Sequence, residues 1–134
     1  MNFKSPILIV AGEPNSVFLE IFFKSLKLKK IKSPLILITS KHILLKQMKR
    51  LGFKKNIKLL NLNEVYNKNI NNESINLIHV EFDQKNAFEK ISKKSNKFIK
   101  ESFQTAFKIL KEGKIYKFIN GPISKKFFLS GKYL

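Results

Sequence analysis

The sequence has 134 residues, no cysteine, and 27 lysines and arginines against nine acidic residues, which gives a net charge of +18. A chain of this length can bury a core, and its 43% hydrophobic content argues against global disorder. The lack of cysteine excludes disulfides and cysteine-ligated metal, and no apolar run approaches the roughly 18 residues of a membrane span.

The amino terminus is better explained by a strand than by a signal peptide. The apolar run of residues 6–11 is short and leads directly into Gly12-Glu13-Pro14. We therefore predict a cytoplasmic protein without a membrane partner.

The positive charge raises the alternative of a basic nucleic-acid-binding module. Of the 27 basic residues, however, only Arg50 is an arginine, and the lysines are spread along the whole chain. Arginine supplies the bidentate contacts favoured for phosphate and guanine. We favour the composition bias of an A+T-rich coding sequence as the cause and expect no specific nucleic-acid partner. The field of so many lysines still favours an anionic substrate.

The first half of the chain alternates between strand and helix patterns. A strand at 6–11 is followed by the turn of residues 12–15 and a helix at 17–29, for which Ser16 is the predicted cap. A second strand at 35–39 precedes a helix at 41–51, which Ser40 caps and Gly52 ends. Residues 57–62 read as a third strand.

The second half continues the alternation after a polar interval. Residues 63–74 are asparagine-rich and predict a loop, and residues 75–80 predict another short strand. Helical periodicity runs from about residue 86 or 95 to 111, where Gly113 ends it. A strand at 115–119, a turn and a short amphipathic segment at 123–129 follow. This order predicts an α/β fold with a largely parallel sheet and helices on both faces.

Two turns are the best candidates for a ligand site. Residues 11–16 and 120–125 each follow an apolar strand, and ligands of open α/β sheets gather at the carboxyl ends of strands. Glycine lets the backbone approach a ligand, a following helix offers N–H groups to an anion, and Lys125 can neutralise a phosphate. The alternative is that both are ordinary turns that bind nothing.

The two histidines, His42 and His79, have no spacing typical of metal ligands, so we interpret both as surface or packing residues. Glu81 and Asp83 lie beside His79, which leaves a metal site there as a weaker alternative.

The same two turns resemble motifs of the 4-hydroxythreonine-4-phosphate dehydrogenases. Residues 12–20, GEPNSVFLE, resemble the family's GDPAGIGPE, with Gly12, Pro14 and Glu20 identical. Residues 120–125, NGPISK, resemble its TGPVHK, with Asn120 in place of threonine. In the first motif, residues 15–18 replace the family's AGIG, so a diverged, non-catalytic relative stays an alternative.

The resemblance implies a fold like that of isocitrate and isopropylmalate dehydrogenases, present here in incomplete form. Residues 1–134 would be the amino-terminal part of a two-domain, homodimeric enzyme of vitamin B6 (pyridoxine) synthesis. Such enzymes oxidise a small phosphorylated substrate, 4-hydroxythreonine 4-phosphate, with NAD or NADP, and the product loses carbon dioxide.

The resemblance also implies a divalent metal held by histidines. The matching histidines would follow residue 134, so we assign no catalytic residue and no metal ligand here, and we expect the chain alone to be inactive. The positions implied in the substrate or cofactor pocket are Gly12, Glu13, Pro14, Asn120, Gly121 and Lys125.

Overall fold

Five parallel strands form the centre of the protein. The computed structural model describes residues 5–67, 69–82 and 93–123. Within them the strand order is β3-β4-β2-β1-β5, and every neighbouring pair is parallel. In chain order the strands are β1 (Ile7–Val10), β2 (Leu35–Thr39), β3 (Ile57–Leu59), β4 (Ile75–His79) and β5 (Lys117–Asn120). The α/β fold with a parallel sheet is therefore confirmed.

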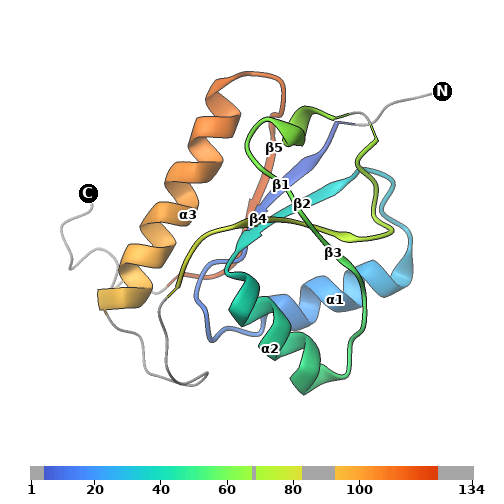
Figure 1. The fold of residues 1–134 in the computed structure, drawn as a ribbon, viewed down its shortest axis with the longest axis vertical. Helices are drawn as coiled ribbons and strands as arrows, with labels where there is room; N and C mark the ends of the chain where they lie inside the picture. Colours follow the sequence, from blue (N-terminus) through green and yellow to red (C-terminus); the bar gives the residue numbers. More distant parts are fainter. Residues whose placement is uncertain (1–4, 68, 83–92, 124–134) are drawn as a thin grey trace.

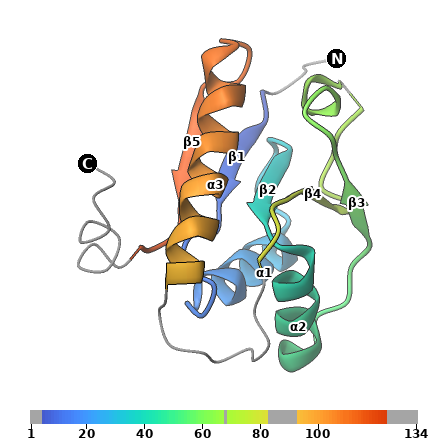
Figure 2. The same cartoon turned by 60° about the vertical axis from the view of Figure 1, so that its left-hand side comes forward.

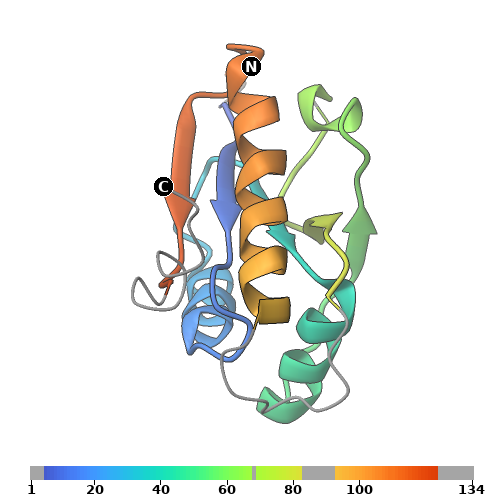
Figure 3. The same cartoon turned by 90° about the vertical axis from the view of Figure 1, so that its left-hand side faces the viewer.

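Helices lie on both faces of this sheet, as the alternation predicts. The helices are α1 (Phe18–Leu28), α2 (Lys41–Leu51) and α3 (Lys93–Lys111). α3 packs on β1 and β2 from one face, whereas α1 and α2 lie together on the other (Figures 1 and 3). Connections between parallel strands are right-handed, so the chain places helices on opposite faces when it moves across the sheet in opposite directions.

The core is centred on β2, whose sequence LILIT is buried along its whole length. Ile36, Leu37 and Ile38 are each 0% exposed, and burial of such side chains stabilises the fold by about 1.5–3 kcal/mol each. β5 lies at the edge of the sheet, next to β1 (Figure 2). This position gives β5 an exposed side, and Ile119 is 49% exposed.

Local signals set the ends of α2 as predicted. The Oγ of Ser40 accepts a hydrogen bond from the N–H of Ile43 at 3.4 Å, and Gly52 ends the helix with a φ of 64°. The prediction for Ser16 is confirmed in part: Val17 holds the N-cap position of α1, but the Oγ of Ser16 accepts a hydrogen bond from the N–H of Phe18, the first residue of the helix, at 3.3 Å. The N–H of Ser16 also donates to the carbonyl oxygen of Glu13 at 3.2 Å, so Ser16 links the preceding turn to the start of α1.

Two strands and one loop differ from the expectations by more than one residue. β3 ends at Leu59, and a short 3₁₀ helix, η1 (Glu64–Tyr66), lies within the segment predicted as a loop. β5 begins two residues later than predicted, because Ile115, at 1% exposed, packs into the core ahead of the strand. Most of the segment predicted at 123–129 lies outside the described residues. Among the residues described, no helix is long and apolar enough to cross a membrane.

Candidate functional site

The register of the sheet brings the two candidate turns together. In the parallel pairing of β1 with β5, Val10 lies opposite Asn120. Both strands therefore end at the same level of the carboxyl edge, and the turn after β1 meets the turn after β5. Val10 and Asn120 are separated by 109 residues of sequence, and periodicity does not reveal that their strands pair.

Backbone hydrogen bonds close the two turns against each other. The N–H of Gly121 donates to the carbonyl oxygen of Val10 at 2.7 Å, and the N–H of Glu13 donates to the carbonyl oxygen of Pro122 at 2.8 Å. The side-chain amide of Asn120 donates to the carbonyl oxygen of Gly121 at 2.9 Å. These peptide N–H groups hold the site together and are already paired, so an anion would have to bind through other groups.

Both glycines are required by this contact. Gly12 has a φ of 83°, and a Cβ there would overlap the carbonyl oxygen of Pro122. A Cβ on Gly121 would overlap the carbonyl oxygen of Ala11 and lie 2.8 Å from Cγ of Phe18. The sequence correctly identifies two positions where backbone approaches closely. In this structure, the backbone that comes close to each turn belongs to the other turn.

The predicted site residues divide into a buried base and a rim. Gly12, Pro14 and Gly121 are buried, Glu13 is half-buried and Asn120 is exposed. Lys125, the proposed phosphate partner, lies outside the described residues. Among the predicted site residues that the structure describes, Glu13 and Asn120 are the two with polar side chains, and both are accessible to solvent.

The amino-terminal end of α1 follows the first of these turns, and its first helical turn contains a carboxylate of the chain itself. Glu20 lies in the first turn of α1, and its carboxylate is 3.6 Å from Nζ of Lys24. A carboxylate in this position interacts favourably with the helix dipole and competes with an external anion. The predicted anion site at this helix therefore has a competitor within the chain.

A pair formed by His79 and Glu81 lies at the same edge of the sheet, at the end of β4. Nδ1 of His79 accepts a hydrogen bond from the N–H of Lys41 at 3.0 Å, and its Nε2 lies 2.9 Å from Oε2 of Glu81. An accepting Nδ1 places the proton of a neutral ring on Nε2, which then donates to Glu81. The sequence could not show this arrangement, because it depends on the pairing of Thr39 with His79.

A cavity of about 380 Å³ adjoins this histidine and is lined by Glu81, Glu101 and Lys108 among others. The cavity lies at the end of β4, and β4 is the neighbour of β2 in the sheet. The helices that follow these two strands, α3 and α2, cover opposite faces of the sheet. α/β proteins bind ligands at such switch points. Sequence reasoning missed this cavity because its wall comes from the middle of α3.

A metal site is a poor fit to the residues that the structure describes. Within the described ranges, no group of three or more histidine, cysteine, aspartate or glutamate side chains is arranged to hold a metal ion. His42 is exposed on α2, His79 is engaged as above, and Asp83 lies outside the described residues. We therefore derive no step of a reaction through a metal.

Solved structures of known proteins share this fold. No protein-family model and no curated protein matches the sequence. Among solved structures, a 4-hydroxythreonine-4-phosphate dehydrogenase from Burkholderia phymatum matches with a TM-score of 0.82 and 19% identity, over 97% of this chain and 40% of its own. The 4-hydroxythreonine-4-phosphate dehydrogenase from Klebsiella pneumoniae matches with a TM-score of 0.80 and 15% identity, again over 97% and 40%.

This chain spans about 40% of the length of those solved structures. At such low identity the likeness establishes the fold and leaves the chemistry to be argued from the site. The predicted resemblance to this family is confirmed at the level of the fold, which this chain shares with part of a 4-hydroxythreonine-4-phosphate dehydrogenase.

Proposed function

We propose that the chain is part of a 4-hydroxythreonine-4-phosphate dehydrogenase that oxidises and decarboxylates 4-hydroxythreonine 4-phosphate in pyridoxine 5′-phosphate synthesis. One observation carries the proposal. The two turns that resemble the family's motifs lie far apart in sequence, yet they close on each other at the carboxyl edge of β1 and β5. This is the edge where α/β sheets bind their ligands.

The proposed roles follow from the chemistry of each residue. Gly12 and Gly121 set the backbone contact, and Pro14 fixes the turn that leads toward α1. Glu13 and Asn120 offer an acceptor and an amide to the polar groups of a small substrate. Lys125 provides an ammonium group for the substrate phosphate. We place the groups that would bind NAD or NADP, the divalent metal and a second subunit outside the residues described.

The proposal predicts binding without turnover for these 134 residues. Because the chain spans about 40% of the solved dehydrogenases, we expect it to bind 4-hydroxythreonine 4-phosphate and to leave NAD and NADP unreduced. Calorimetric titration measures binding, and NADH absorbance measures turnover. Substrate-dependent reduction of NAD by this chain alone would contradict the expectation.

Lysine variants test the assigned phosphate contact. We expect Lys125→Ala to weaken binding of 4-hydroxythreonine 4-phosphate by about tenfold, as loss of one charge-assisted contact does. Lys97→Ala is the matched control, because the Lys97 side chain is 77% exposed on α3. Equal affinity for the Lys125→Ala variant and the unaltered chain would remove the proposed role.

One contact favours a diverged relative as the second candidate. Phe18 stands where the family motif has a glycine, and its ring carbon Cγ would lie 2.8 Å from a Cβ on Gly121. An aromatic ring beside the turn restricts access to it. If the chain has lost substrate binding for this reason, Phe18→Gly should increase its affinity for 4-hydroxythreonine 4-phosphate, whereas unaltered weak binding would place the loss elsewhere.

A further inference from the structure

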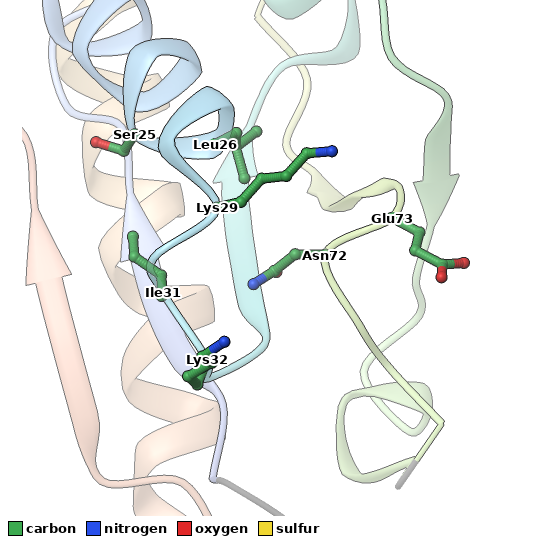
Figure 4. Close-up of a pocket in the computed structure, with 7 residues that line it drawn as sticks. All are labelled: Ser25, Leu26, Lys29, Ile31, Lys32, Asn72 and Glu73. Atoms are coloured by element: carbon green, nitrogen blue, oxygen red, sulfur yellow. The ribbon is translucent and has the colours of Figure 1, made fainter.

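A lysine-lined groove crosses the amino edge of the sheet, at the end opposite to the two turns. One cavity of about 700 Å³ lies between the segment after α1, with Lys29 and Lys32, and the segment before β4, with Glu73 (Figure 4). A second cavity of about 610 Å³ is lined by Lys54 and Lys55, which precede β3, and also by Glu73. Glu73 lines both cavities, so they lie beside each other, and the two together are called the amino-edge groove.

Fixed hydrogen bonds build one wall of this groove. The Oδ1 of Asn72 accepts from the N–H of Leu35 at 2.8 Å, and its Nδ2 donates to the carbonyl oxygen of Ser33 at 2.9 Å. These two bonds tie the segment before β4 to the start of β2. The groove is therefore a shaped feature of the fold.

Apolar side chains form the floor between the lysines. Leu26, Met48 and Phe53 line the cavities and are at most 8% exposed. Ile31 and Leu45 also line the cavities and are 39% and 47% exposed. An occupant can therefore bury apolar groups here while anionic groups contact the lysines at the rim.

The charge around the groove is strongly unbalanced. Residues 18–58, which include α1 and α2, contain 12 lysines and arginines and one acidic residue, Glu20. The other described residues contain eight basic and six acidic residues. A field of one sign over a shaped groove attracts an occupant of the opposite sign. The lysines are thus spread along the whole sequence, but residues 18–58 contain only one acidic residue to balance their 12 basic ones.

The side chains of the groove suit a polypeptide better than a nucleic acid. Binding of single strands relies on exposed aromatic rings that stack on bases, and Phe53 is 8% exposed. Arg50, the one arginine of the chain, already donates through Nε to Oε1 of Gln47 at 3.0 Å. Lysine ammonium groups above an apolar floor match carboxylates and apolar side chains.

We propose that the amino-edge groove binds an acidic polypeptide segment that carries apolar side chains between its carboxylates. The apolar side chains occupy the floor, and the carboxylates pair with Lys29, Lys32, Lys54 and Lys55. Glu73 is the one carboxylate among the lining residues and opposes this binding. The site is separate from the two turns, so the proposal does not depend on the dehydrogenase function.

A labelled probe peptide of alternating glutamate and leucine tests the groove by fluorescence anisotropy. We expect Lys29→Glu/Lys32→Glu to weaken binding of the probe by at least about tenfold. The matched control Lys97→Glu/Lys111→Glu makes the same change of charge on α3 and should alter the affinity by less than about twofold. Glu73→Gln should strengthen binding, which separates a charge effect from unfolding of the variant.

Two further probes decide the class of partner. A peptide with serine in place of leucine keeps the charge and should bind at least about tenfold more weakly, because it cannot occupy the apolar floor. A thymidine oligonucleotide of equal charge should compete poorly. Equal losses from the groove and α3 variants, equal binding of the serine peptide, or full competition by the oligonucleotide would each overturn the proposal.

Discussion

The N–H of Glu13 donates to the carbonyl oxygen of Pro122 at 2.8 Å, so the turn after β1 is closed by the turn after β5. This contact joins the two ends of the described chain at one edge of the sheet. It also explains why glycines precede each of these residues, since a Cβ at either glycine would overlap the backbone of the other turn.

The first prediction concerns the space at Gly12. Gly12→Ala should lower the free energy of unfolding by about 1 kcal/mol for the positive φ and by a further 1–3 kcal/mol for the overlap with Pro122. Gly113→Ala is the control, because Gly113 has a similar φ of 79° and nothing within 4 Å of its added Cβ. Urea unfolding measures both variants. Equal losses would show that the turns do not pack as closely as described.

The second prediction concerns the histidine at the end of β4. His79→Ala leaves the N–H of Lys41 without its acceptor at the start of α2, so we expect a loss of about 1 kcal/mol in the free energy of unfolding. His42→Ala, at an exposed position in the same helix, should cost less than about 0.5 kcal/mol. A similar cost for the two variants would mean that the hydrogen bond from Lys41 to His79 does not stabilise the start of α2.

The third prediction concerns the ionisation of Tyr66. Burial raises the pKa of Tyr66 above its ordinary value, and the carboxylate of Glu112 raises it further. A raised pKa in the folded state means that the unfolded chain loses this proton first as the pH rises. The stability contributed by Tyr66 is therefore present below about pH 10 and is lost as the pH rises through the folded pKa.

Ultraviolet titration of the phenolate tests this ionisation, with Tyr66→Phe supplying the difference spectrum that isolates one of the three tyrosines. Glu112→Gln should lower the pKa of Tyr66 toward that of the urea-denatured chain. A Tyr66 signal that titrates identically in the folded and denatured chains would refute the prediction.

Hydrophobic patterns were sufficient to predict most elements of the fold. The unbroken run LILIT indicates a strand covered on both faces, and β2 is buried throughout. The ends of α2 were predictable because each depends on neighbouring residues alone. The side chain of Ser40 bonds Ile43 three residues later, and Gly52 adopts the positive φ that ends the helix. Ser16 also bonds the start of α1 through its hydroxyl, although the N-cap position itself falls one residue later, at Val17.

Pairings between distant segments could not be predicted in this way. The strand order, the contact of Gly12 with Gly121 and the hydrogen bond from Lys41 to His79 all depend on which strands become neighbours. The amino-edge groove was missed for the same reason, since its lysines lie in two separate connections and Glu73 lies in a third. The expectation that no nucleic acid binds specifically stays a prediction, which the oligonucleotide competition tests.

The most direct test of the proposed site is a nuclear magnetic resonance titration of the ¹⁵N-labelled chain with 4-hydroxythreonine 4-phosphate. We predict saturable shifts of the amide signals of Gly12, Glu13 and Gly121, with little change at Lys29 and Lys32. Shifts confined to the amino-edge groove, or no saturable shift at the two turns, would contradict the assignment of the carboxyl edge as the substrate site.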